Sequence, residues 1–277
     1  MEQEEAISVT KTPTGITTIT ITRPHRRNAV DPSTAKLLYT AVTAFEDDPS
    51  QKVLILNGSN GTFSAGFDLH SLASSASTDA ALAGGSGSFD VSKKRQIGPM
   101  GPSRLTVQKP VIAAVSGHAV AGGLELSLIA DMRIAEETAV FGVFCRRFGV
   151  PLIDGGTVRL QAIVGLGRAL DMILTGRPVS ANEALAMGLA NRVVPEGKAL
   201  EEAEKIANQL LVFPQECMNL DRRSAYYAAY EASGFGDAMK YEFDNGVKVI
   251  SEESVSGAKR FSSGVGRHGS FGGEGKL

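Results

Sequence analysis

Two short apolar runs, residues 53–56 (VLIL) and 111–115 (VIAAV), constrain the fold of this chain more than any other feature. Both are bounded by turn-forming residues, which is typical of strands that are buried on both faces. Residues 16–21 (ITTITI) alternate apolar and polar positions as a half-buried strand does. Strands of this kind interleaved with helices predict an α/β fold.

Helical patterns surround and follow these strands. Asp31, Pro32 and Ser33 provide helix-start chemistry, and apolar residues recur at helical spacing as far as Phe45. From Gly155 onward the pattern is mainly helical, and it predicts helices over residues 157–164, 167–174, 180–187, 198–212, 215–232 and 236–252.

Two segments lack the pattern of a strand or a helix. Residues 71–102 are rich in Ser, Gly and Ala and have few large apolar side chains, so we expect a mobile loop there. The residues after Ser262 are rich in glycine and are expected to end loosely.

Composition excludes several classes of protein. The 277 residues carry a formal net charge of −2, with 43% hydrophobic and 21% charged residues, which is ordinary for a globular protein. No basic stripe suggests nucleic-acid binding and no apolar run is long enough to span a membrane, so we expect neither partner. Cys145 and Cys217 and the four histidines lack metal-ligand spacing, and no metal site is expected.

The N-terminal sequence MEQEEAISV is acidic and resembles neither a secretory signal nor a transit peptide. We therefore expect a cytoplasmic protein. The final residues Gly-Lys-Leu only loosely resemble a peroxisomal ending, so a peroxisomal location is the alternative.

Two glycine-containing segments follow the predicted buried strands. Residues 63–69 (FSAGFDL) follow the first, where glycine lets the backbone approach a ligand closely. Residues 117–126 (GHAVAGGLEL) follow the second, and Gly122 opens an apolar segment, residues 124–130, that reads as a buried helix. Free N–H groups at such a helix start bind anions and could form an oxyanion hole.

Glu125 lies in the first turn of that predicted helix. Leu128 and Ile129, three and four positions later, place its carboxylate on an apolar face. A buried carboxylate is costly unless it is paired, so Glu125 is either a structural acid with satisfied hydrogen bonds or a functional one.

These segments and others in order along the chain resemble the enoyl-CoA hydratase/isomerase superfamily, the crotonase-like proteins. The similarity runs from about residue 7 to about residue 260. The matching stretches are Arg23-Pro24, Asn28-Ala29, residues 63–69, 109–118, 122–125, 130–135, 141–142, 155–160, 174–176, 181–184 and 188–194.

The resemblance implies a spiral of ββα units over residues 1–195, a helical trimerisation region over residues 196–260 and a loose tail over residues 261–277. It also implies a homotrimer or a dimer of trimers that acts on an acyl-CoA thioester in fatty acid metabolism, with no separate cofactor because coenzyme A belongs to the substrate.

By the same resemblance, the backbone N–H groups of Phe67 and Gly122 form the oxyanion hole that stabilises a thioester enolate. The region around Arg26, Ala65, Phe67 and Leu69 receives the coenzyme A moiety. Arg26 or Arg27 neutralises its phosphates in this interpretation, and simple surface charge is the alternative for both arginines.

One position departs from the hydratase pattern. Hydratases of this family use two glutamates around one water; the first matches Glu125, and an ungapped count places Cys145 at the second. A thiol is a poor substitute for a carboxylate because its reference pKa is about 8.5. Arg146 and Arg147 could stabilise a catalytic thiolate. Alternatively, Cys145 only fills space.

Asp154 offers a second acid, one position from an aspartate that acts in some relatives. It either transfers protons or activates water, or it forms the turn before Gly155. His118 is expected to point into packing, Asp131 to bond backbone at the end of the Glu125 helix, and neither these two nor His70 is expected to be catalytic.

We interpret the chain as an acyl-CoA enzyme, a hydratase-like lyase on a non-standard substrate, with Glu125, Asp154 and Cys145 as candidate catalytic residues. A double-bond isomerase, a thioester hydrolase and a non-catalytic acyl-CoA binder remain alternatives. The acyl chain is not indicated, although the 71–102 segment is expected to form part of the pocket wall or lid.

Overall fold

The computed structural model describes residues 5–74 and 89–264. The chain divides into two compact units, residues 1–204 and residues 205–277. This boundary falls inside helix α8 (Ala199–Leu211), a few residues after the change of region expected at residue 195. The trimerisation role of the second region stays a prediction.

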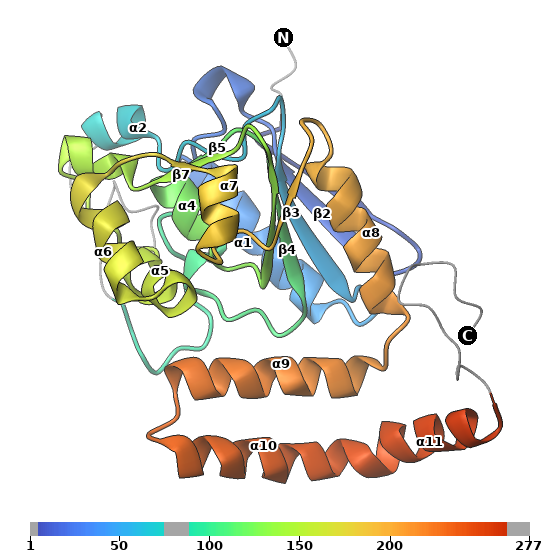
Figure 1. The fold of residues 1–277 in the computed structure, drawn as a ribbon. Coiled ribbons are helices and arrows are strands. Elements are labelled where there is room, and N and C mark those ends of the chain that lie inside the picture. Colours follow the sequence, from blue (N-terminus) through green and yellow to red (C-terminus); the bar gives the residue numbers. More distant parts are fainter. Residues whose placement is uncertain (1–4, 75–88, 265–277) are drawn as a thin grey trace. The chain divides into compact units, whose positions relative to one another are not determined.

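A six-stranded sheet of order β1-β2-β3-β4-β6-β9 forms the centre of the first unit (Figure 1). β1 is antiparallel to β2, and the remaining neighbours are parallel. The strands are β1 (Ile7–Lys11), β2 (Ile16–Ile21), β3 (Val53–Gly58), β4 (Val111–Val115), β6 (Met132–Glu136) and β9 (Arg192–Val194).

The three predicted strands are confirmed as β2, β3 and β4. All residues of β4 are buried, and Asn57 is the one partly exposed residue of β3. Burial on both faces is why the sequences of β3 and β4 are continuous apolar runs, whereas that of β2 alternates.

A second sheet of order β5-β7-β8 consists of β5 (His118–Val120), β7 (Val140–Gly142) and β8 (Val179–Ser180). β4 and β5 are followed by α4 (Gly122–Ser127), and β6 and β7 lead through η3 (Phe144–Phe148) to α5 (Gly156–Val164). These are two successive ββα units, so the predicted architecture is confirmed. The second strand of each unit delivers the chain to the start of a helix.

The remaining helices of the first unit are α1 (Pro32–Asp47), α2 (Leu69–Ala73), α6 (Leu166–Thr175), α7 (Ala181–Ala186) and the 3-10 turns η1 (Pro24–Arg26) and η2 (Pro102–Arg104). α1 begins where the sequence predicts, because the Asp31 side chain accepts a hydrogen bond from the backbone N–H of Thr34. α4 ends at Ser127, earlier than the predicted residue 130.

The second unit contains helices alone in the part of the chain that the structure describes. α9 (Gln215–Tyr230) and α10 (Phe235–Val249) are followed by a π-helical turn η4 (Ile250–Ser254) and α11 (Val255–Ser262). All six helices predicted after Gly155 are confirmed. α11 continues through residue 262, so the predicted start of the tail at residue 261 is wrong; residues 265–277, with the final Gly-Lys-Leu, lie outside the described residues.

The expected mobile loop over residues 71–102 is wrong at its C-terminal end. Residues 75–88 lie outside the described residues, but Met100 and Pro102 are buried and Gly98 and Gly101 exchange two backbone hydrogen bonds of 2.8 Å. Gly101 (φ +76°) packs so closely on α1 that a Cβ would lie 2.5 Å from the carbonyl oxygen of Ala35. Long-range packing therefore orders a segment whose composition suggests a loop.

No helix in the described ranges combines the length and the apolarity that a membrane crossing requires.

Candidate active site

A cavity of about 470 Å³ opens within the first unit. Its wall comes from residues 65–72, from Pro99, from residues 121–125 of α4 and from residues 144–154. Glu125, Cys145 and Asp154 are the ionisable side chains among the lining residues; the others are apolar or glycine. A mainly apolar cavity with a few convergent polar groups is typical of a small-molecule site.

The backbone N–H of Phe67 is turned away from its neighbouring segment. Val30 donates to the carbonyl oxygen of Gly66 at 2.8 Å and accepts from the N–H of Asp68 at 2.9 Å. In this parallel bridge the hydrogen-bonding groups of Phe67 itself point to the opposite side. Phe67 also lines the cavity, so its N–H is available to a ligand.

Gly122 presents the second N–H as the first residue of α4, where no carbonyl of the same helix can accept it. A Cβ on Gly122 would lie 3.3 Å from the Phe67 nitrogen, and a Cβ on Gly66 would lie 2.8 Å from the Gly122 nitrogen. The two N–H groups therefore lie close together, and neither donates to an acceptor among the described residues. This pair of donors is what an oxyanion hole requires.

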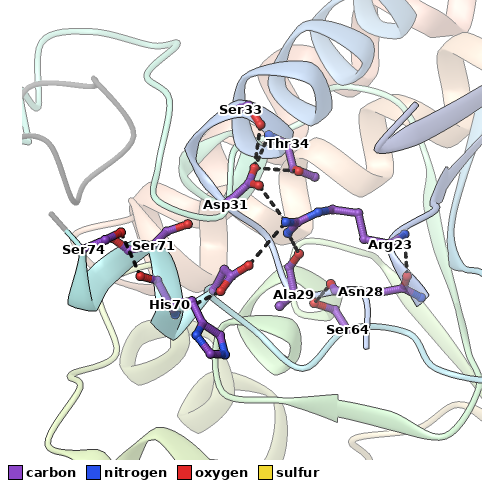
Figure 2. Close-up of polar contacts among 11 residues, drawn as sticks. Arg23, Asn28, Ala29, Asp31, Ser33, Thr34, Ser64, His70, Ser71 and Ser74 are labelled. Atoms are coloured by element: carbon purple, nitrogen blue, oxygen red, sulfur yellow. Dashed lines mark hydrogen bonds and ion pairs between the residues drawn. The ribbon is translucent and has the colours of Figure 1, made fainter. Parts of the chain in front are cut away.

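Asn28 is hydrogen-bonded to the segment that leads to Phe67, and Figure 2 shows its contact with Ser64. The amide of Asn28 donates to the carbonyl oxygens of Ser59 and Thr62 at 2.9 and 2.6 Å. Ser64 donates to the Asn28 carbonyl oxygen at 2.8 Å and accepts from the Gly66 N–H at 3.1 Å.

The guanidinium of Arg23 adds ion pairs on the same side. It lies 2.7 Å from an Asp31 carboxylate oxygen and 3.3 Å from one of Asp68, the residue after Phe67 (Figure 2). The N–H groups of Phe67 and Gly122 are called the N–H cradle below. The stretch from Arg23 to Asn28, which in the sequence is recognisable only through the family resemblance, therefore helps to fix the backbone of this cradle on the Phe67 side.

Glu125 projects from α4 into the cavity and is 3% exposed. Its Oε1 accepts hydrogen bonds from the N–H groups of Asp154 and Gly156 at 2.9 and 2.8 Å. A Cβ on Gly156 would lie 2.8 Å from that oxygen, so glycine permits the contact. Burial, with the nearby Asp154 charge, raises the pKa of Glu125 to about 8. Glu125 is thus mainly protonated at neutral pH.

Asp154 is the second buried acid of the cavity, also 3% exposed. Its Oδ1 accepts from the Met100 N–H at 3.1 Å and from the Ser103 hydroxyl. Burial raises its pKa, opposed by these hydrogen bonds and by the charges of Arg104 and Arg159. If Asp154 served only to form the turn before Gly155, its side chain would not need to accept hydrogen bonds from Met100 and Ser103, far away in sequence.

Comparison with known proteins agrees with this geometry. A family model described as enoyl-CoA hydratase/isomerase matches residues 11–262. The chain belongs to the enoyl-CoA hydratase/isomerase family. A carnitinyl-CoA dehydratase of Salmonella typhi is 37% identical over 198 residues, 70% of each chain. An enoyl-CoA hydratase of Mycobacterium tuberculosis is 32% identical over 252 residues, 88% of this chain and 89% of that protein.

The fold comparison is equally direct. The crystal structure of an enoyl-CoA hydratase from Mycobacterium marinum superposes with a TM-score of 0.82 at 27% identity, covering 95% of this chain and 97% of that one. An enoyl-CoA hydratase subunit from Geobacillus kaustophilus gives a TM-score of 0.81 at 28% identity, covering 94% and 96%.

Within this family framework, Cys145 lies in η3, is buried and lines the cavity. Burial and the nearby Glu125 charge raise the pKa of its thiol, outweighing the opposite effect of Arg146. The Arg146 guanidinium instead donates to the carbonyl oxygen of Ile173 at 3.1 Å. These contacts favour a neutral, space-filling thiol over a thiolate stabilised by Arg146 and Arg147.

The residues suggested for coenzyme A divide into two groups. Ala65, Phe67 and Leu69 line the cavity. Arg26 and Arg27 are exposed at η1 and do not line it, although the Arg27 carbonyl oxygen accepts the Ala65 N–H at 3.0 Å. Their role in binding phosphates stays a prediction.

The remaining polar residues of these segments behave in different ways. Asp131 accepts the Val111 N–H at 2.7 Å, so it bonds backbone as expected, but this partner lies at the start of β4 and not in the turn after the helix. His118 is exposed, so the expectation that it points into packing is wrong; in β5 Ala119 faces inward and His118 outward. The exposed His70 donates its backbone N–H to Asp68 at 3.0 Å.

Sequence reasoning missed Met100 and Ser103, which hold Asp154, and Phe144 and Phe148, which line the cavity. No local motif marks any of them. In the ranges 5–74 and 89–264, no group of His, Cys, Asp and Glu could hold a metal ion.

Replacing Glu125 with Gln should change how stability depends on pH. Between the ordinary value of 4.5 and about 8, the unfolded chain ionises Glu125 while the folded chain keeps its proton. Wild-type stability therefore falls as pH rises through this window, by at most ~1.4 kcal/mol per pH unit, and a neutral Gln removes the fall. Urea unfolding at several pH values measures this difference.

Glu137→Gln is the matched control, because Glu137 is an exposed glutamate of the same unit. Its stability should follow the wild type at every pH. If the free energy of unfolding of Glu125→Gln depends on pH in the same way as that of the wild type across this range, Glu125 does not hold its proton in the folded protein.

Proposed function

We propose that this protein binds an α,β-unsaturated acyl-CoA thioester and adds water across its double bond, as a hydratase-like lyase acting on a non-standard substrate. One observation carries the proposal: the cradle N–H groups of Phe67 and Gly122 line the same apolar cavity as the buried acids Glu125 and Asp154. The relatives named as hydratase and dehydratase support the same class of reaction.

The cradle is suited to the charge that develops during the reaction. Attack of water at the β-carbon moves electrons onto the thioester oxygen, and two preorganised N–H groups stabilise that enolate. Losing one such donor typically costs on the order of 10²–10³ in rate. Ala65 and Leu69, beside Phe67 in the cavity wall, would contact the thioester arm, and Arg26 would reach the phosphates outside.

We assign the two acids different roles in the reaction. Glu125 holds a proton near neutrality, and the charge of Asp154 helps to keep it there. Asp154 would accept a proton from water as the oxygen–carbon bond forms, and Glu125 would deliver its proton to the α-carbon. The sum is the addition of one water, after which the proton on Asp154 returns to Glu125 through solvent. The reaction needs no separate cofactor.

The non-standard substrate follows from position 145. A neutral thiol replaces the second carboxylate of the standard hydratase, and the acid next to Glu125 is instead Asp154. The attacking water would therefore approach from the Asp154 side, and a substrate must place its β-carbon there. The wall around Cys145 is apolar, with Phe144, Phe148 and Val150.

Product analysis with Asp154→Asn tests the mechanism. Wild-type protein incubated with a panel of enoyl- and acyl-CoA thioesters should yield a product heavier by one water. Asp154→Asn and Glu125→Gln should each lower turnover by roughly 10²–10⁴-fold while thioester binding persists. Mass spectrometry of the thioesters and binding calorimetry provide the two readings.

Asp47→Asn, at an exposed position, is the matched control and should behave as wild type. A product of unchanged mass with a shifted double bond would make the protein an isomerase, and free coenzyme A would make it a thioester hydrolase. Binding without turnover of any thioester would favour an acyl-CoA binder. Each of these outcomes would contradict hydration.

We propose further that the second unit assembles the protein into a homotrimer or a dimer of trimers. Large apolar side chains recur every three or four residues along α10 and η4 and are 46–83% exposed. They are Phe235, Met239, Phe243, Val247 and Ile250. A continuous apolar stripe on a helix is usually covered by another chain.

Phe243→Asp should therefore shift the protein toward monomers in analytical ultracentrifugation, because an unpaired charge would be buried in the interface. Glu242→Lys, at the neighbouring exposed position, should leave the assembly unchanged. A wild-type protein that sediments as a monomer would refute the assembly.

A further inference from the structure

We infer that Ser103 is a positioning residue for Asp154: it holds one oxygen of this carboxylate so that the other faces the substrate cavity. The inference rests on the proposed role of Asp154 as the base. Ser103 does not line the cavity and would not touch substrate. It lies directly after the segment, residues 71–102, whose composition suggested a mobile loop.

The contacts at Oδ1 of Asp154 come from one short stretch of chain. The fully buried Ser103 donates its hydroxyl, and Met100 donates its N–H at 3.1 Å. No described residue donates to Oδ2, and Asp154 lines the cavity. With two donors on one oxygen, the carboxylate cannot rotate without losing both hydrogen bonds, so the second oxygen stays directed at the cavity.

The backbone of this stretch is shaped to allow the contact. A Cβ on Gly98 would lie 2.3 Å from the Ser103 hydroxyl oxygen and 2.7 Å from Oδ1 of Asp154. Either distance is shorter than van der Waals contact permits, so any other residue at position 98 would displace Ser103 or Asp154. Glycine at this position is explained by the hydrogen bond beside it.

Arg159 connects the two segments from the other side. Its Nη1 donates to the carbonyl oxygens of Ser103 and Asp154 at 2.6 and 3.3 Å, and its Nη2 donates to that of Leu105 at 3.2 Å. A Cβ on Gly155 (φ +92°) would lie 2.4 Å from Nη1. The backbones that carry the serine and the aspartate are therefore held together independently of the serine hydroxyl.

Glu125 is held in the same manner, with two donors on Oε1 and none from the described residues on Oε2. The difference lies in the charged neighbours. Arg104 and Arg159 both lower the pKa of Asp154, whereas for Glu125 the charge of Asp154 raises the pKa and Arg159 lowers it. The Ser103 hydroxyl lowers the pKa of Asp154 against the effect of burial, and so favours the ionised carboxylate.

A double-mutant cycle tests this role. Ser103→Ala should lower kcat by roughly 10- to 100-fold, the usual effect of losing a hydrogen bond to a charged group, with little change in KM. It should also move the acid limb of the kcat–pH profile to higher pH, because the ionised carboxylate loses a donor. In an Asp154→Asn background the same substitution should add little further loss, because there is no carboxylate left to position.

Ser116→Ala is the matched control. Ser116 is another buried serine that donates to a buried carboxylate, Glu136 Oε1 at 2.9 Å, and neither residue lines the cavity. Its kcat–pH profile should match the wild type. Ser103→Cys, which keeps a weak donor of similar size, should lie between wild type and Ser103→Ala, and thermal unfolding of each variant monitors folding.

Two results would overturn the inference. One is an equal loss from Ser103→Ala with and without Asp154, which would show that the serine acts through the fold. The other is a wild-type pH profile and kcat in Ser103→Ala. Full activity of Asp154→Asn would instead refute the proposed base itself, so the two failures are distinguishable.

Discussion

The hydrogen bonds from the Asp154 and Gly156 N–H groups to Oε1 of Glu125 organise this active site. A carboxyl group that is 3% exposed is tolerated because two backbone donors satisfy one of its oxygens. The same contact ties α4, which presents the Gly122 N–H, to the turn that presents Asp154. One interaction therefore sets the relative positions of the cradle and of both acids.

Local patterns in the sequence were sufficient for most of the fold. Burial on both faces gives β3 and β4 continuous apolar sequences, and amphipathic spacing marks the helices after Gly155. The sequence also indicated free N–H groups at the start of the helix that begins at Gly122, whereas the assignment of Phe67 and Gly122 as an oxyanion hole came from the resemblance to the family. These features depend on short stretches of chain.

The support of Asp154 could not be predicted in this way. Met100 lies in, and Ser103 directly follows, a segment rich in Ser, Gly and Ala, and their positions depend on contacts with α1 and with the turn before α5, far away in sequence. The choice between the two alternatives for Cys145 could not be made from the sequence for a related reason: the adjacent arginines are obvious in the sequence, whereas the burial that raises the pKa of the thiol is a property of the folded chain.

The structure also explains how the site can lack the second glutamate. In the proposed mechanism Asp154, whose N–H donates to Glu125, supplies the second carboxyl group of the cavity, and Cys145 forms part of a mainly apolar wall.

The central claim is that the N–H groups of Phe67 and Gly122 stabilise a thioester enolate. An ultraviolet difference titration with acetoacetyl-CoA tests it directly, because the enolate of this thioester absorbs where its keto form does not, and a site complementary to the enolate favours that form. We predict a saturable enolate band at a pH where free acetoacetyl-CoA is mainly in its keto form. Binding of acetoacetyl-CoA without that band would contradict the claim.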